Sequence, residues 1–372
     1  MFEYYFPADD AIIYFTNKAS GFSVAEFAET TKKAHPSLSS EIRRILHPAV
    51  ELERILDASI GSCAKLDFYF RLDPTFGGEL IPLMNPAWLI FGYRAGMGDG
   101  GLPLRELAKR RLGLSIAEKE RLFKSYLSDL AGTDAPFQTN PAEDPRDLFV
   151  VMRDMELPAE IRIRLIELYT NFDEYVPELV GILEPVVKLI EANAALYETP
   201  VLALEREIAS TPGGIGGYMQ KMHNFTVNER GSHLPHPCLL APNMINIHDG
   251  LFDGMDIYIG VGVRELMNSI YAGSGSKKLV SICKTLADET RLEILHCICE
   301  RPMYGLEIAE AFSVSAPTVS YHMNKLVING LCDSYFSGGK SYYRANFENL
   351  GEFVRALSHY LGESPLDKNE PR

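Results

Sequence analysis

Two stretches of this sequence place metal-binding side chains at short spacing. In the first, H-x-x-H-x-C, His233, His236 and Cys238 offer the imidazole and thiolate groups that zinc prefers. The prolines among them stiffen the chain, and no fourth ligand follows at a fixed spacing, so a turn leading into a strand is the simpler interpretation. We therefore predict no metal here, and keep as an alternative a metal-responsive protein that uses these three residues.

The second stretch is the C-x-C pair Cys297 and Cys299, with His296 beside it. On a helix, side chains at positions i and i+2 point in different directions and do not converge on one ion. The six cysteines are sparse and never form C-x-x-C, which is typical of buried free thiols rather than of a disulfide framework. We expect these two thiols to pack in a core.

Neither glycine-rich stretch matches a nucleotide-binding loop. GGIGGY at 213–218 departs from G-x-G-x-x-G because position 219 is Met, and GGKS at 338–341 lacks the first glycine of a P-loop. The sequence also contains no G-x-S-x-G elbow and no H-E-x-x-H helix. We therefore predict no catalytic residues and no cofactor.

The stretch SAPTVSYHMNKL, residues 315–326, has polar side chains along one side of a predicted helix. Ser315 suits the N-cap and Pro317 the first turn, and Val319, Met323 and Leu326 recur at helical spacing on one apolar face. The side chains left outside that face are polar: Thr318, Ser320, Tyr321, Asn324 and Lys325. On the first turns of a helix that follows a short turn, such groups reach base edges in the DNA major groove.

The elements around this stretch predict how it is held. Helices are expected over 278–286, after Asp288 as an N-cap, and over 306–312, where the turn SVS follows. Beyond the helix at 315–328, the alternating runs LCDSYF and SYYRANF surround the glycine turn SGGK, and a last helix covers 348–361. This order of elements is that of a winged helix-turn-helix, so the sequence predicts a DNA-binding domain over 279–363.

Three stretches in this region resemble the ArsR/SmtB family of bacterial winged-helix repressors. They are LADETRLEIL (286–295), LEIAEAFSVSAPTVSYHMNKLVINGL (306–331) and SYFSGGKSYYRAN (334–346), and the resemblance covers about a quarter of the chain. It implies a transcriptional regulator, a repressor, that binds double-stranded, palindromic operator DNA as a homodimer. It implies DNA contacts from the recognition helix 315–328 and the wing at 337–341: Ser315, Thr318, Ser320, Tyr321, Asn324, Lys325, Lys340 and Arg344.

The resemblance also implies a dimer interface, and it allows metal sensing to be judged from the cysteines. The last helix carries an apolar stripe that comprises Leu350, Phe353, Leu357 and Tyr360. With the first helix, this stripe would form the interface between two copies. The alternative is that the stripe packs within one chain. Metal-sensing members of the family have a Cys-x-Cys on the helix before the recognition helix. That helix reads LEIAEAF here and has no cysteine, so metal sensing is not carried over.

The front of the chain differs in charge from this region. The formal net charge is −14, yet residues 276–363 carry nine Lys and Arg against ten Asp and Glu, which leaves 27 against 40 for the rest. A surface this acidic excludes general adhesion to nucleic acid. We place a linker at AGSGSKK (272–278), an effector or dimerisation domain over 1–271, and a disordered tail over 364–372.

The predicted fold class is α+β, with a mostly helical front domain that contains a small sheet or hairpin. LDFYFR (66–71) alternates as a strand does, and residues 238–262 read as a long hairpin. Ser23 with Glu26 is the capping box of a helix. The chain starts without a signal peptide and has no apolar run of about 20 residues, so we expect a cytoplasmic protein without membrane association.

The size of the front domain suggests that it binds a small-molecule effector that alters DNA binding. We expect no enzyme activity, since no catalytic motif is present. An enzyme domain fused to a DNA-binding module is retained as an alternative.

Overall fold

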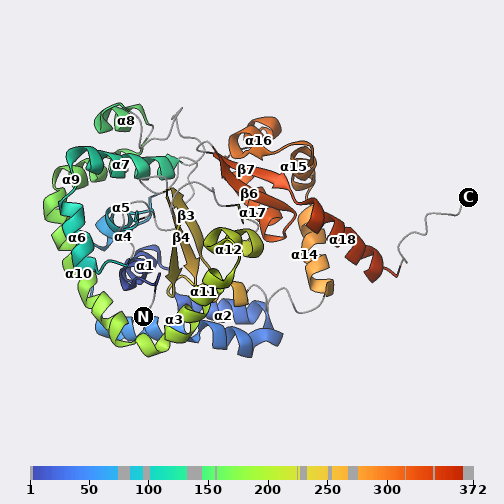
Figure 1. Ribbon diagram of the computed structural model, residues 1–372, viewed down its shortest axis with the longest axis horizontal. Helices are drawn as coiled ribbons and strands as arrows, with labels where there is room; N and C mark the ends of the chain where they lie inside the picture. The colour runs from blue at the N-terminus through green and yellow to red at the C-terminus, as the bar shows by residue number, and fades with distance from the viewer. Residues whose placement is uncertain are drawn as a thin grey trace, which may run out of the picture. The chain divides into compact units, whose positions relative to one another are not determined.

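The chain folds into two compact units. The computed structural model describes residues 3–73, 84–94, 101–131, 145–155, 157–223, 225–226, 233–249, 254–266, 275–314, 316–337 and 340–362. The front unit comprises Met1–Ile215 and Glu229–Leu266, and the C-terminal unit comprises Gly216–Asn228 and Met267–Arg372. Figure 1 shows the elements of both. Residues 216–228, which the sequence placed in the front domain, therefore group with the C-terminal unit.

Helices make up most of the front unit. They are α1 (Pro7–Ser20), α2 (Val24–Ala34), α3 (Ser39–Ser59), α4 (Leu66–Phe70), α5 (Pro86–Phe91), α6 (Leu104–Leu112), α7 (Ile116–Ala131), α8 (Leu148–Asp154), α9 (Ala159–Thr170), α10 (Phe172–Ala192) and α11 (Glu198–Ser210), with the short 3-10 turns η1 (Pro36–Leu38) and η4 (Ala194–Leu196). The predicted N-cap of α2 is confirmed, because Oγ of Ser23 accepts from the backbone N–H of Glu26 at 3.4 Å.

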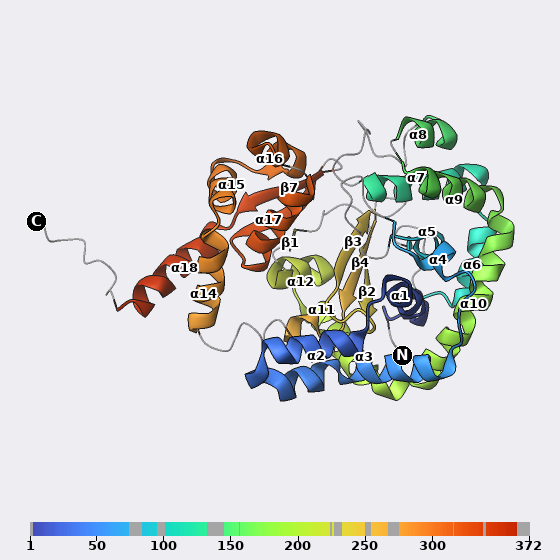
Figure 2. The same ribbon diagram turned by 180° about the vertical axis from the view of Figure 1, so that it is seen from behind.

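A three-stranded sheet lies inside the front unit. Its strands are β2 (His233–Cys238), β3 (Ile245–Asp249) and β4 (Met255–Gly260), in the order β2-β4-β3. The predicted hairpin is confirmed over β3 and β4, which pair antiparallel. Its expected first residue, Cys238, instead ends β2, which pairs with β4 in parallel. Helix α1 contacts both this sheet and α10 (Figures 1 and 2).

The predicted strand at 66–71 is wrong, because Leu66–Phe70 forms the short helix α4. Its alternation arises from aromatic residues that pack in several directions. Phe70 stacks on Phe15 at 4.8 Å between ring centroids, whereas Phe68 lies 5.0 Å from Tyr175 of α10. A short apolar run does not distinguish a buried strand from a buried helical turn, and here the surrounding aromatic packing decides.

A cluster of charged side chains is buried where α1 meets the sheet. The two ring nitrogens of His236 lie 2.8 Å from carboxylate oxygens, Nδ1 from Asp9 and Nε2 from Asp256. Arg94 pairs with Asp9, and its backbone N–H donates to Asp256 at 2.9 Å. All four side chains are at most 1% exposed. Burial would lower the pKa of His236, but the two carboxylates raise it above its ordinary value.

The same cluster contradicts the alternative of a metal site on β2. Both ring nitrogens of His236 are occupied by carboxylates, and Sγ of Cys238 donates to the carbonyl of His236 at 3.2 Å. His233 lies three positions from His236, and successive side chains of a strand alternate between faces, so the two imidazoles diverge. Among the described residues no three or more His, Cys, Asp or Glu side chains are grouped so that they could hold a metal ion.

The C-terminal unit has the element order that the sequence predicts. Its elements are α12 (Gly214–His223), β1 (Phe225–Thr226), α14 (Gly275–Leu286), α15 (Glu289–Glu300), β5 (Met303–Tyr304), α16 (Gly305–Phe312), α17 (Ala316–Ile328), β6 (Cys332–Ser337), β7 (Lys340–Ala345) and α18 (Phe347–Tyr360). The α+β class is confirmed. The short strands β1 and β5 were not predicted, and they extend the sheet to the order β1-β6-β7-β5.

One expected boundary in this unit differs from the structure, and another is not described. Helix α14 begins at Gly275, so the second half of the expected linker 272–278 is helical, because a helix tolerates Gly and Ser in its first turn. The expected disordered tail at 364–372 lies outside the described residues.

Candidate DNA-binding site

The turn between α16 and α17 is set by one residue in an uncommon conformation. Ser313 ends α16 with φ of 53°, in the left-handed region, and its N–H donates to the carbonyls of the last turn. The N–H of Val314 donates to the carbonyl of Ala309 at 3.1 Å. The chain thus leaves α16 sharply and enters α17 within three residues, as a helix-turn-helix requires.

One face of α17 is buried as predicted. Val319, Met323 and Leu326 are at most 2% exposed and join a core with residues of α15, α16 and β6. His322 is also buried, and its Nδ1 lies 3.7 Å from the carboxylate of Asp288, the N-cap of α15. This contact was not predicted, although an imidazole one position from the core face is a signal for it.

The end of α17 is tied to α14 by hydrogen bonds that the sequence analysis did not predict. Asn329 Nδ2 donates to Oγ1 of Thr285 at 3.0 Å and to the carbonyl of Lys325 at 2.9 Å. Oγ of Ser281 donates to Oδ1 of Asn329 at 2.8 Å. An Asn just beyond a helix is a common C-terminal cap, but its partners in α14 are distant in sequence.

The predicted outer residues of α17 are described to different extents. Lys325 is exposed and Thr318 is half-buried. Ser320, Tyr321 and Asn324 have their backbone in α17, at positions away from the buried face, and their side chains lie outside the described part of the structure. Ser315 lies outside the described residues.

The wing is the hairpin β6–β7. Its register pairs Ser337 with Lys340, and Asp333 with Arg344. Nε of Arg344 lies 3.5 Å from Oδ2 of Asp333, and the other carboxylate oxygen accepts from Asn346 at 2.8 Å. Arg344 is 48% exposed, so this pair offsets part of the charge that it would offer to a phosphate. The side chain of Lys340 and the predicted glycine turn at 338–339 lie outside the described part.

Three cysteines of this unit face its core, whereas Cys283 of α14 is exposed. Cys297 and Cys299 of α15 are half-buried against the apolar cluster, and Cys332 of β6 is fully buried. Burial raises the pKa of the thiols of Cys299 and Cys332. A raised pKa keeps a thiol protonated and disfavours the thiolate that a metal requires, which agrees with the packing role expected for this region.

These elements define a winged helix-turn-helix, with α16 and α17 as the two helices and β6–β7 as the wing (Figure 1). The family described as "Bacterial regulatory protein, arsR family" matches residues 288–334. The arsenical resistance operon repressor of Staphylococcus aureus is 35% identical over 22% of this chain and 79% of its own length. The chain therefore belongs to the ArsR family, and it is a DNA-binding transcriptional regulator.

Two further proteins match about the same share of this chain. The HTH-type transcriptional regulator KmtR of Mycobacterium tuberculosis is 32% identical over 23% of this chain and 72% of its own length. Among solved structures, an ArsR-like transcriptional regulator from Rhodococcus sp. RHA1 is 30% identical, with a TM-score of 0.23, over 23% of this chain and 82% of that one. No helix in the described part of this chain combines the length and apolar character that crossing a membrane requires.

Proposed function

We propose that this protein is a repressor whose helix α17 enters the major groove of operator DNA. The observation that carries the proposal is the division of α17 into a buried apolar face and an outer face that includes exposed Lys325. The residues assigned to base and phosphate contacts are the ones that the sequence predicts: Ser315, Thr318, Ser320, Tyr321, Asn324 and Lys325.

We assign the wing a supporting role on the DNA backbone or in the minor groove. Lys340 starts β7, beside the hairpin end that the register sets at Ser337. Arg344 is farther from this end and shares its charge with Asp333, so we expect Lys340 to contribute more than Arg344 to phosphate binding.

We further propose that two copies bind a palindromic operator as a homodimer through α14 and α18. The two helices pack together within one chain, and several of their apolar side chains stay in solvent. Val280 of α14 is 51% exposed, and α18 leaves Val354 58% and Tyr360 64% exposed. Of the predicted stripe, Leu350 and Phe353 pack against the core of their own unit. The exposed remainder is the surface that a second copy would cover.

The front unit is proposed to sense a small molecule and to alter operator affinity. A coupling of about 1–3 kcal/mol between a ligand and the spacing of the two α17 helices changes affinity by about 5- to 150-fold. The path of the chain supports this coupling. Residues 216–228, which include most of α12 and all of β1, belong to the C-terminal unit, and the chain then returns to the front unit at β2.

The DNA-binding proposal is tested by fluorescence anisotropy with the full-length protein and a duplex from its own promoter region. The double variant Ser320→Ala with Tyr321→Ala should lose specific binding and keep the weak, salt-sensitive binding to unrelated duplexes. Equal affinity of the variant and the unmodified protein for the promoter duplex would contradict the assignment of α17. Unchanged circular dichroism shows that the variant is folded.

A further inference from the structure

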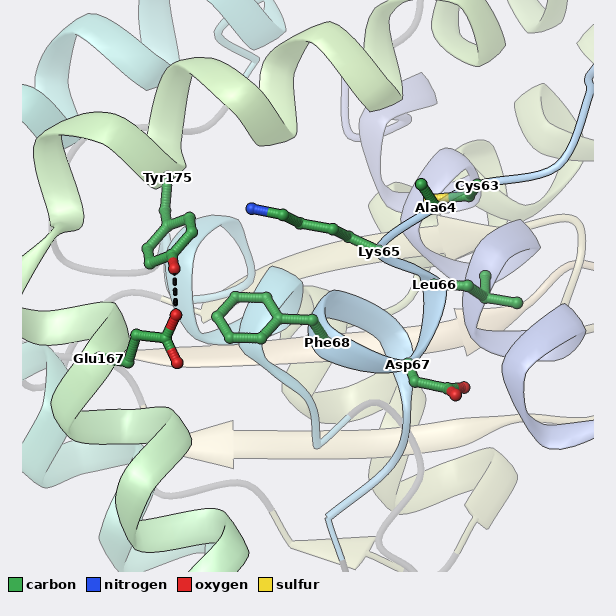
Figure 3. A pocket seen from close by; sticks show the side chains of 8 residues that line it. All are labelled: Cys63, Ala64, Lys65, Leu66, Asp67, Phe68, Glu167 and Tyr175. Carbon is green, nitrogen blue, oxygen red and sulfur yellow. Dashed lines mark hydrogen bonds between the residues drawn. The ribbon is translucent and has the colours of Figure 1, made fainter.

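A cavity of about 280 Å³ opens on the front unit between the segment 63–68 and the helices α9 and α10. Figure 3 shows Lys65 and Phe68 reaching across it toward Tyr175 and Glu167, whereas Leu66 and Asp67 point the other way. The cavity is small, and aromatic faces and carboxylates dominate the side that Lys65 faces. It is large enough for an organic molecule of a few carbon atoms.

Two aromatic rings in this cavity face the same positive charge. Nζ of Lys65 lies 4.8 Å from the ring centroid of Tyr175 and 5.8 Å from that of Phe68. The two rings lie 5.0 Å apart and are tilted by 38°, and the ammonium group lies beside both of them. Aromatic faces attract cations within about 6 Å of the ring centroid.

Carboxylates complete the surroundings of this ammonium group. Oε2 of Glu178 lies 2.7 Å from Nζ of Lys65 and also accepts from the hydroxyl of Tyr69 at 3.1 Å. The hydroxyl of Tyr175 donates to Glu167, and this bond raises the pKa of Tyr175 to about 12. The tyrosine therefore keeps its proton at neutral pH, and its ring presents the neutral face that a cation contacts.

The charges of the site favour a cation over an anion. Glu167 and Glu178 approach the space from α9 and α10, whereas Lys65 is the cation beside the two rings. An incoming carboxylate would meet two like charges and the negative faces of two rings. The side chain of Lys65 is 41% exposed, so it can move into water and leave the rings and Glu178 to another ammonium group.

We propose that this cavity binds a small organic ammonium ligand, which takes the place that the side chain of Lys65 occupies between Tyr175, Phe68 and Glu178. Lys65 then acts as an internal competitor that holds the site closed until the ligand is abundant. The proposal that a ligand binds is argued from the site alone. Only the role of this ligand as an effector rests on the proposed function.

A second lysine of the front unit provides a matched control. Nζ of Lys119 lies 4.4 Å from the ring of Tyr169 and 5.7 Å from the ring of Phe172. Its ammonium group donates to the carbonyl of Tyr169 at 3.4 Å, and not to a carboxylate as Lys65 does. Removal of Lys119 thus exposes two rings without an equivalent of Glu178.

The test uses propylammonium, which reproduces the atoms that Lys65→Ala removes beyond Cβ. Ligand-observed NMR titrations compare the full-length protein with Lys65→Ala, Lys119→Ala and Lys65→Ala combined with Glu178→Gln. We expect Lys65→Ala to bind propylammonium about tenfold more tightly than the unmodified protein, since the internal competitor is gone. Lys119→Ala should bind propylammonium with the same affinity as the unmodified protein. Adding Glu178→Gln to Lys65→Ala should lower the affinity again, toward that of the unmodified protein.

Propionate serves as the anionic probe of the same length. Tighter binding of propionate than of propylammonium, or no gain on Lys65→Ala in a protein of unchanged circular dichroism, would overturn the proposal. Operator affinity is measured separately with and without propylammonium. A change in operator affinity supports the role of the ligand as an effector. If propylammonium binds and operator affinity does not change, the site is supported and the effector role is contradicted. Loss of operator binding under all conditions contradicts the proposed function and leaves the ligand result intact.

Discussion

Asn329 Nδ2 donates a 3.0 Å hydrogen bond to Oγ1 of Thr285 and thereby joins the end of α17 to the end of α14. The same amide accepts from Oγ of Ser281 at 2.8 Å. Both partners belong to the helix that we propose to form part of the dimer interface. The direction of α17 is therefore linked to α14, and through it to the arrangement of two copies on an operator.

Asn329→Ala should lower the free energy of unfolding of the C-terminal unit by about 1–3 kcal/mol, because it removes three hydrogen bonds and leaves Thr285 and Ser281 to find other partners. Urea unfolding followed by circular dichroism measures the change. Ser281→Ala is the control, since it removes one of the three bonds and should cost about 1 kcal/mol or less. Equal losses for the two variants would contradict this account of Asn329.

The sequence predicts the C-terminal unit well because its signals are local. Asp288 is confirmed as an N-cap that accepts from the N–H of Arg291 at 2.9 Å, and the apolar face of α17 is buried as its spacing indicates. Such caps and spacings depend on a few neighbouring residues. The links of Asn329 to α14 and of His322 to Asp288 join residues more than 30 positions apart, which spacing does not reveal.

The front unit was predicted less well for the same reason. The hairpin of β3 and β4 is local and was found, whereas the parallel partner β2 and the helix α4 are set by packing between distant segments. His236 was weighed as a metal ligand because its neighbours in sequence are His233 and Cys238. Its actual partners, Asp9 and Asp256, come from the start of the chain and from another strand.

Lys325→Ala should weaken binding to every duplex by a similar factor. Lys325 is the exposed cation of α17, and a lysine that neutralises a phosphate releases one counterion from DNA. The slope of log affinity against log salt should therefore decrease by about 1. Anisotropy titrations over a range of salt concentrations measure it. Lys188→Ala, at a lysine of α10 that is 66% exposed, is the control and should leave the slope unchanged.

Charged substitutions on α18 should separate the proposed homodimer. Val354→Asp with Tyr360→Asp places carboxylates where the side chains are 58% and 64% exposed, so the fold of one chain is unaffected. Sedimentation should then detect the 41.6 kDa chain alone, and operator affinity should fall. The control is Ile163→Asp, at a 65% exposed position of the front unit. An unchanged mass for the α18 variant would place the interface elsewhere.

Asp10 should make the front unit less stable as the pH rises from about 4 to 6. Burial raises the pKa of Asp10 to about 6, against the lowering effect of hydrogen bonds from the N–H groups of Leu240 and Leu239. A folded pKa above the unfolded value means that the native state binds more protons, so the contribution of Asp10 to stability is greatest below pH 4 and declines up to pH 6. Trp88, the only tryptophan, is buried in this unit, so its fluorescence reports urea unfolding there. Asp10→Asn should flatten the decline, and an unchanged pH profile would exclude Asp10 as its source.

His236 should produce a second decline at higher pH. Its pKa is raised because the effect of Asp9 and Asp256 exceeds the lowering effect of burial. The stability that the charged imidazole provides is thus complete below its unfolded pKa of about 6.5 and is lost as the pH rises through the folded pKa. His236→Leu leaves two buried carboxylates with Arg94 as their remaining cationic partner in this cluster, and should cost about 3–5 kcal/mol at pH 6.

The difference between the two proteins should narrow as the pH rises through the folded pKa of His236, because the unmodified imidazole then loses its proton. Urea unfolding by Trp88 fluorescence at pH 6, 7.5 and 9 measures this convergence. His248→Leu, at a histidine of the neighbouring strand β3, controls for the loss of an imidazole from the sheet. A cost for His236→Leu that is the same at all three pH values would show that the imidazole acts by packing on Tyr258, from which its ring lies 4.1 Å, and not by its charge.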